Sequence, residues 1–211
     1  MMPPHKPCGE RRTNKCPSNR GATAAEIQAD WPGDRLVSDP ETVFTRAIDI
    51  EAPPSSVWQW LVQFGLGRAG FYSYELLERI IGIPVVNIES VMPQFQTLGV
   101  GDAILLHPTA PGIPVADVRP GERLCFGVSG ELADRFEKLD PARSWSMYLL
   151  PRGRAGTRLV LRGCVEPLRA DSLRARLGQR LEQPIDFVME QRMLRTIRRL
   201  AERPVRDEAA A

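Results

Sequence analysis

The hydrophobic pattern is most regular over residues 53–82, where it predicts two short amphipathic helices joined by a glycine-rich turn. Apolar residues recur at helical spacing before the glycines, and again from Ser73, a predicted N-cap, to Gly82. The two predicted buried stripes are Val57, Trp60, Leu61 and Phe64, and Leu76, Leu77, Ile80 and Ile81. Helices this short are not stable alone, so the rest of the chain must provide a surface that covers them.

Alternating apolar and polar residues predict strands on both sides of this helical pair. One strand at 42–50 precedes it, and the segments that follow it are separated by turn residues. These later segments are 103–107, 113–118, 123–128, 144–150 and 157–165. Short strands at this spacing predict an antiparallel meander.

The carboxy-terminal part is predicted to be helical. A first segment is marked by Leu173, Leu177 and Leu181, and Pro184 is expected to restart the helix, which then runs to about Arg203. One stripe of the second segment holds Ile185, Met189, Met193, Ile197 and Leu200, with Val188 beside it. We therefore expect an α+β fold in which a long helix packs on the sheet.

Two arginines interrupt the strand patterns. Arg46 shares a face with Phe44 and Ile48, so it is either a buried cation that needs a carboxylate or ligand anion, or a side chain that reaches water from a bulge or edge. Arg162 is expected to face solvent, because it alternates with Leu159 and Leu161. Arg46 is therefore the better candidate for an anion anchor.

The composition fits one domain with tails. The chain has 211 residues, of which 43% are hydrophobic, enough for one core. We expect a disordered basic tail at 1–20, an extended arm at 21–41, the folded domain at 42–203 and a flexible tail at 204–211. No apolar run has the length of a membrane span and no secretory signal is evident, so we expect a cytoplasmic protein.

The charge and the number of possible metal ligands argue against some classes of function. The net charge is only +2 and acidic residues are interleaved with basic ones, which does not favour nucleic-acid binding. The four cysteines are scattered and there are two histidines, so neither a metal site nor a cofactor is expected. The sequence also has no nucleophile elbow, phosphate loop or Ser/His arrangement.

Several segments resemble a known superfamily. The sequence APPSSVWQWLVQFG at 52–65 resembles the strand-to-helix signature of the START-related, SRPBCC-type proteins. The segments GRAGFYSYELLERIIG, PQFQTLGVGD, SWSMYLLP and GTRLVLRG resemble its bacterial polyketide cyclase and lipid-transport-like subgroup. The resemblance covers about residues 35–203. It implies a helix-grip fold, in which a curved antiparallel sheet, two short helices and a long terminal helix surround a cavity.

Three functions remain open. The first is the binding of a hydrophobic or amphipathic small molecule in the cavity, by a carrier or sensor without catalysis. The second is an aromatase or cyclase that moves protons with Tyr72, Tyr74, Glu75 or Glu78. The alternative is that these tyrosines anchor the turn and the glutamates lie on a solvated helix face. The third is an interaction module that contacts a protein or an acidic membrane. The candidate ligand-binding residues are Arg46, Trp58, Tyr72, Tyr74, Gln96, Trp145, Met147, Met189 and Met193.

Overall fold

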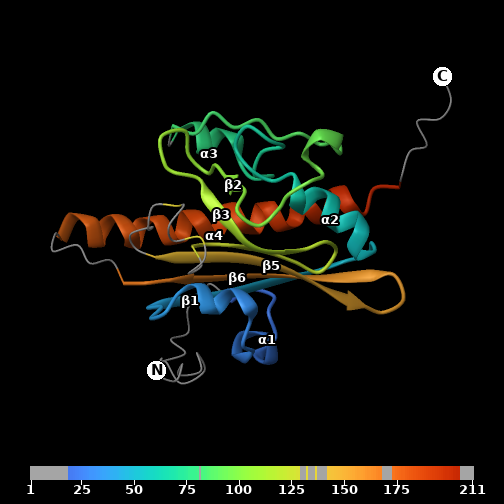
Figure 1. Ribbon diagram of the computed structural model, residues 1–211, viewed down its shortest axis with the longest axis horizontal. Helices are drawn as coiled ribbons and strands as arrows, with labels where there is room; N and C mark the ends of the chain where they lie inside the picture. Colours follow the sequence, from blue (N-terminus) through green and yellow to red (C-terminus); the bar gives the residue numbers. More distant parts are fainter. Residues whose placement is uncertain are drawn as a thin grey trace.

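The alternating segments form one antiparallel sheet, as the sequence predicts (Figure 1). The computed structural model describes residues 19–80, 82–128, 132, 136, 142–167 and 173–204, with only the backbone of 173–184. The strand order is β1-β6-β5-β4-β3-β2, and the sheet is curved and open. The strands are β1 (Thr42–Ile50), β2 (Ala103–Ile104), β3 (Ile113–Arg119), β4 (Arg123–Phe126), β5 (Arg143–Arg152) and β6 (Gly156–Val165).

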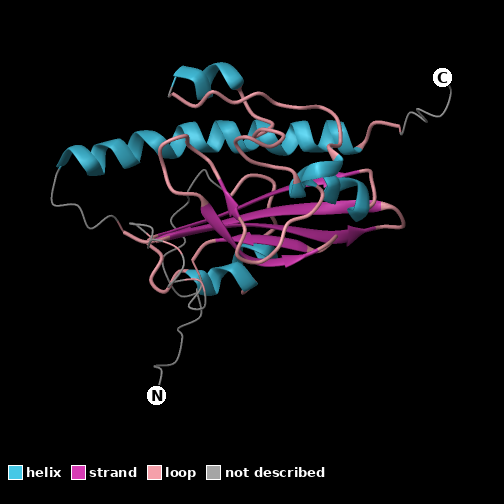
Figure 2. Cartoon of the chain, turned by 45° about the horizontal axis from the view of Figure 1, so that its top comes forward, coloured by secondary structure: helices cyan, strands magenta, loops and turns pink. Residues whose placement is uncertain are grey.

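Helices lie on both sides of this sheet (Figure 2). The fold is α+β, because the sheet is antiparallel and most of its strands follow one another without an intervening helix. The long helix α4 and the short helices after β1 lie on one side, which we call the inner face, and α1 lies on the other, the outer face (Figure 1). The helices are α1 (Ala24–Gln28), α2 (Pro54–Val62), α3 (Glu75–Ile80) and α4 (Leu173–Ala201), with 3-10 turns η2 (Pro32–Leu36) and η3 (Pro93–Phe95).

Several expectations from the sequence concern residues that the structure does not describe or describes only as backbone. Residues 1–18 of the predicted tail at 1–20 lie outside the described residues, as do Ile81 and residues 205–211. The side chains of Leu173, Leu177 and Leu181 are likewise outside the description.

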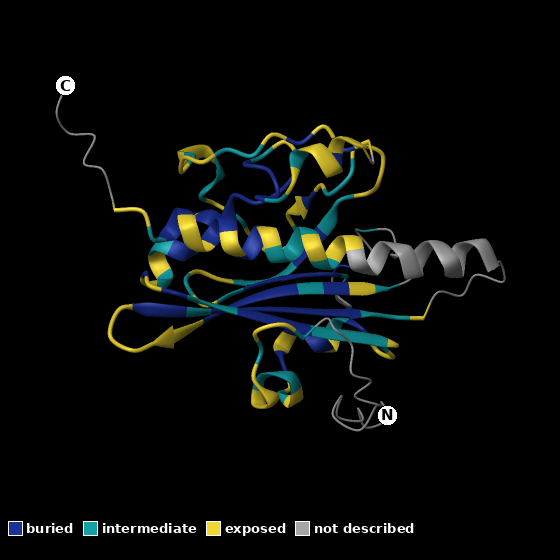
Figure 3. Cartoon of the chain, turned by 180° about the vertical axis from the view of Figure 1, so that it is seen from behind, coloured by how far each residue is buried: buried dark blue, intermediate teal, exposed yellow. Residues whose placement is uncertain are grey.

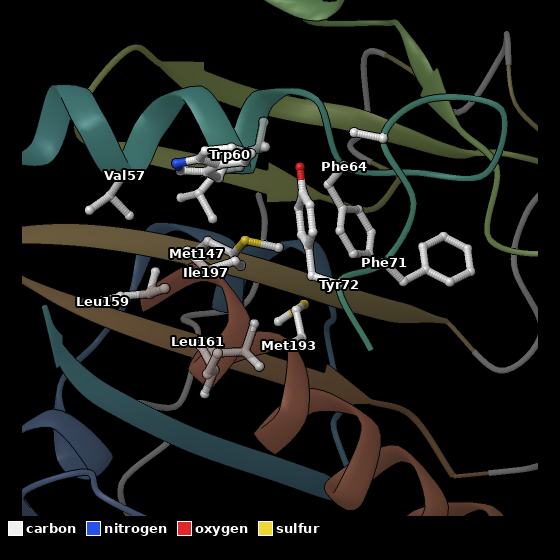
Figure 4. Packing of buried hydrophobic residues seen from close by; sticks show 14 of the residues in the cluster. Val57, Trp60, Phe64, Phe71, Tyr72, Met147, Leu159, Leu161, Met193 and Ile197 are labelled. Atoms are coloured by element: carbon white, nitrogen blue, oxygen red, sulfur yellow. The ribbon is translucent and has the colours of Figure 1, made fainter. Parts of the chain in front are cut away.

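The first helix of the predicted pair packs as expected. Val57, Trp60 and Leu61 of α2 are buried, and Phe64 just beyond its end is buried with them. Figure 4 shows this face of α2 above the side chains of β5, β6 and α4, where Trp60 lies near Met147. The stripe is buried because α2 covers the inner face of the sheet.

The stripe predicted for the second helix is wrong. Leu76 and Ile80 are 72% and 71% exposed, and Leu77 is 38% exposed, whereas Glu78 is completely buried. The orientation of this six-residue helix follows from the turn before it, since Tyr72 has a φ of +57° and the Asn87 side-chain oxygen accepts the N–H groups of residues 71 and 72. Local apolar spacing does not encode these long-range contacts. Figure 3 shows α3 largely exposed at the edge of the molecule.

The terminal helix also differs from expectation. It is continuous from Leu173 to Ala201, so Pro184 does not restart it. Proline removes one backbone donor, and here the residues on both sides continue the helix across that gap. Of the predicted stripe, Met193, Ile197 and Leu200 are buried, Met189 is half-buried, and Ile185 is 43% exposed. Among the described side chains of this stripe, those from Met193 onward are buried, and α4 contacts α2 and β1.

The outer face is covered by the segment at 19–37, which contains α1 and η2. The expectation that Arg162 faces solvent is consequently wrong, because this side chain is only 2% exposed. Its Nε and Nη2 atoms donate to Asp34 at 2.9 and 2.8 Å. Alternation placed Arg162 on the correct face, but it could not show that a distant segment covers that face. Among the described residues, no helix is long and apolar enough to cross a membrane.

Candidate functional site

The candidate site lies on the inner face of the sheet, beginning with a row of side chains across β1, β6 and β5. In this row Gly163 pairs with Phe44 on one side and with Trp145 on the other. Directly opposed residues project to the same face, so two aromatic rings flank a position without a side chain. A Cβ at Gly163 would lie 2.2 Å from Cζ of Phe44. The glycine therefore allows the Phe44 ring to lie close to the backbone of β6.

Arg46 stands in the next row and is only 3% exposed. Its guanidinium carbon lies 4.3 Å from the ring centroid of Phe44 and 5.0 Å from that of Phe187 on α4. It also forms an ion pair with Glu190 of α4. Of the two alternatives left open by the sequence, the structure shows the inward one, and Glu190 is the carboxylate.

Glu190 joins the arginine to the aromatic row. The indole Nε1 of Trp145 donates to Glu190 Oε1 at 3.0 Å. The side chain of Glu190 is 15% exposed, compared with 4% for Arg46, so the carboxylate lies where the interior meets solvent. Sequence reasoning missed this residue. A signal was present, because Leu194 and Ile197 continue a buried stripe four and seven residues after it.

Apolar side chains surround this polar group. The Trp145 ring lies 5.1 Å from Phe64 and 5.8 Å from Phe126, centroid to centroid. Met147 and Met193, both predicted ligand contacts, are completely or almost completely buried. Figure 4 shows them close to Leu161 of β6. Met189 and Trp58 are half-buried. The site thus combines one ion pair with a predominantly apolar lining.

Tyr72 lies beside this lining and belongs to a separate polar cluster. It is 1% exposed, and burial raises its pKa to about 12. Its hydroxyl accepts a hydrogen bond of 2.8 Å from the amide of Gln63. Gln63, which sequence reasoning missed, also accepts from the amide of Gln96 at 3.1 Å and from the N–H of Met92 at 2.9 Å. A buried amide with so many partners fastens the turn at 63–72 to the loop at 90–96.

The remaining proton-transfer candidates divide into buried and exposed groups. Glu78 is completely buried, and burial raises its pKa. Ser73 Oγ donates to Oε1, whereas Oε2 has no hydrogen-bond partner among the described residues. Glu75 accepts from the N–H of Asn87 and lies 3.8 Å from Arg79 at the surface. Tyr74 is 40% exposed and lies under the guanidinium of Arg192.

The structure therefore gathers only part of the predicted set. Arg46 and Trp145 meet through Glu190, with Met147 in the row of Arg46 and Met193 one turn beyond Glu190 on α4. Tyr72 and Gln96 meet through Gln63 instead, and Tyr74 lies at the surface. No group of three or more His, Cys, Asp or Glu residues is placed to hold a metal ion within the described part of the chain.

Comparisons with known proteins concern the fold. No protein-family model matches this chain, and no curated protein matches it either. A solved structure from Chromobacterium violaceum is 17% identical and covers 77% of this chain and 98% of its own, with a TM-score of 0.43. One from Nitrosomonas europaea is 16% identical, with coverages of 77% and 95% and a TM-score of 0.43. An HSP90 activator from Plasmodium falciparum is 12% identical, with coverages of 59% and 74% and a TM-score of 0.37.

Proposed function

We propose that this chain binds a hydrophobic or amphipathic small molecule between the inner face of the sheet and α4, as a carrier or sensor without catalysis. The sequence motifs that resemble the START-related superfamily support the same interpretation, as does the order of strand, short helices, meander and long helix. The resemblance would make the chain a helix-grip protein. A curved sheet and a straight helix cannot touch everywhere, and the space left between them suits an apolar ligand.

The observation that carries the proposal is the buried guanidinium of Arg46 on an otherwise apolar face. Burial of an ion pair costs several kcal/mol per ion, about as much as the pair returns, so stability alone does not account for it. Arg46 lies between the rings of Phe44 and Phe187. An apolar space with one oriented charge is the arrangement that fixes the direction in which an amphipathic ligand enters.

The lining gives the second support. Phe44, Trp145, Phe187 and Met189 are half-buried, although each contributes to or borders the inner face. Further along the sheet and α4, by contrast, Met147, Leu161 and Ile197 are completely buried. Partial exposure of large apolar side chains next to a fully buried core is expected where a ligand, instead of protein, completes the packing.

Native mass spectrometry of freshly purified protein, joined to titration with the neutral dye Nile red, tests the proposal. We expect a co-purifying apolar compound, or saturable dye binding. Met189→Trp should weaken dye binding at least fivefold because the larger ring fills the half-buried position, whereas Arg195→Trp, on the exposed side of the same helix, should not. An empty protein that binds no dye would refute the proposal.

One observation favours a second candidate, a cyclase-type enzyme. Glu78 is a buried carboxyl with a raised pKa and one oxygen without a hydrogen-bond partner among the described residues. Such a group is a stronger base than a solvated carboxylate and could take the proton between two carbonyl groups of a polyketone, leaving an enolate, and later return it. Deuterium exchange at the central carbon of a 1,3-diketone in D2O, followed by NMR, tests this. We expect Glu78→Gln to abolish exchange and Glu89→Gln to preserve it; exchange at the buffer rate in the wild type would refute it.

A further inference from the structure

We propose that the inner-face site takes the carboxylate of an amphipathic acid, and that Glu190 occupies the headgroup position until this carboxylate replaces it. The inference rests on the proposed binding function and deepens it by naming the headgroup. Glu190 is a carboxylate held by the Arg46 guanidinium and by the indole N–H of Trp145. These are the two donors that a ligand carboxylate would need.

The surroundings of Arg46 favour a planar anion at the edge of the guanidinium. Phe44 approaches it from the sheet and Phe187 from α4, each in the position of a cation–π contact. The guanidinium carbon lies over both rings, and the ion pair with Glu190 shows that an N–H group of Arg46 reaches a carboxylate at this position. A planar carboxylate matches that edge better than any uncharged group.

Glu190 is also the more exposed member of the pair. Its side chain is 15% exposed and lies one helical turn after the exposed Asp186, whereas the Arg46 side chain is 4% exposed and stands at the middle of β1. When a ligand carboxylate arrives, the carboxylate of Glu190 can turn outward into water. The charge beside Arg46 is then unchanged, so the exchange leaves no buried cation without an anion.

The apolar body of the ligand has a place beside this headgroup. The Phe44 ring lies over Gly163, and Trp145 stands on the other side of this glycine, so the two half-buried rings form an apolar surface in the row beside Arg46. Phe187 of α4, also half-buried, borders the same position through its contact with Arg46. A chain or ring that lies along these residues would keep its acid group beside Arg46. The ligand is therefore an acid with an extended or aromatic hydrocarbon part.

Fluorescence titration with 12-(1-pyrenyl)dodecanoic acid and its methyl ester tests the headgroup. The wild type should bind the acid at least tenfold more tightly than the ester, because only the acid replaces the charge of Glu190. Arg46→Met should remove this preference by weakening the acid alone. Glu190→Gln should strengthen acid binding about fivefold and leave the ester unchanged, because it removes the competing charge.

The possible results distinguish the headgroup inference from the proposed binding function on which it rests. If acid and ester bind equally well to the wild type and to Glu190→Gln, the headgroup inference is overturned and the binding function stands. If neither probe binds, the binding function fails and the inference with it. Should Arg46→Met not fold, the Glu190→Gln comparison still decides. Competition by dodecanoate and dodecyl phosphate distinguishes two anions, and tenfold stronger displacement by the phosphate would overturn the carboxylate.

Discussion

Two buried arginines stand on opposite faces of the same sheet, and their surroundings differ. Arg162 on the outer face donates twice to Asp34, and its Nη1 donates to Thr45 Oγ1 at 2.6 Å and to the carbonyl of Ile27 at 3.1 Å. Arg46 on the inner face contacts two aromatic rings and pairs with Glu190. Both side chains are almost completely buried.

These surroundings indicate a different role for each arginine. The Asp34 side chain is 6% exposed. The Arg162 guanidinium that pairs with it also donates to the backbone carbonyl of Ile27, in the same segment at 19–37. The outer ion pair therefore links this segment to the sheet. On the inner face, Glu190 is more exposed and shares its carboxylate with an indole donor. We therefore expect the outer pair to act mainly in stability, and the inner pair is the one at which we propose ligand binding.

The largest expected effect is the loss of stability in Arg162→Met. Removal of this cation leaves Asp34 buried without its partner, which should lower the free energy of unfolding by about 3–5 kcal/mol. Arg46→Met should cost less, about 1–2 kcal/mol, because Glu190 can turn toward water. Urea unfolding of both variants measures the contrast. The double variant Arg162→Met with Asp34→Asn should recover most of the loss, and equal losses at the two arginines would contradict the comparison.

The aromatic row of the inner face provides the next test. Gly163→Ala places a Cβ within 2.2 Å of the Phe44 ring, so the ring must move away from β6. We expect a loss of about 1–3 kcal/mol in urea unfolding, together with weaker binding of the apolar dye. Gly99→Ala is the matched control, because the nearest atom to its Cβ would be 3.8 Å away. A Gly163→Ala protein with unchanged stability and dye binding would show that the Phe44 position does not matter.

Much of the fold could be predicted because it depends on local periodicity. The strands and α2 follow from alternation and from the spacing of Val57, Trp60 and Leu61, whose buried face meets the sheet. The burial of Arg162 could not be predicted, since its partner Asp34 is 128 residues away in the sequence. The orientation of α3 likewise depends on Asn87, which holds the preceding turn.

The candidate site was only partly predictable for the same reason. An arginine among the apolar residues of a strand is visible in the sequence, so Arg46 was found, but its carboxylate lies on a helix far along the chain. Glu190 was not predicted, because the neighbouring stripe of Met189 and Met193 already accounts for the buried face of the terminal helix. The proposed ligand contacts of Trp58, Met189 and the others stay predictions.

The outer face holds an ion pair whose contribution to stability depends on pH. The Arg158 hydrogen bond holds the pKa of Glu26 at about 2, despite partial burial. A lowered pKa contributes stability above the ordinary value near 4.5, and this contribution is lost as the pH falls toward 2. Glu26→Gln should therefore cost about 1–3 kcal/mol at pH 7 and almost nothing near pH 2 in urea unfolding. The exposed carboxylate variant Glu122→Gln is the control, and a loss from Glu26→Gln that is independent of pH would contradict this interpretation.

The smallest expected effect lies on the inner side, at Glu78, and has the opposite sign. Burial raises the pKa of this carboxyl, so the folded protein binds its proton more tightly than the unfolded chain does. The stability from that proton is present below the ordinary pKa of a glutamate and is lost as the pH rises through the folded value. Glu78→Gln, which keeps a neutral group of the same shape, should gain on the order of 1 kcal/mol over the wild type at pH 8 and little at pH 4. Urea unfolding at the two pH values measures this difference. If both proteins lose stability in parallel between pH 4 and pH 8, the pKa of Glu78 is not raised in the fold, and this carboxylate is not the stronger base that the cyclase candidate invokes.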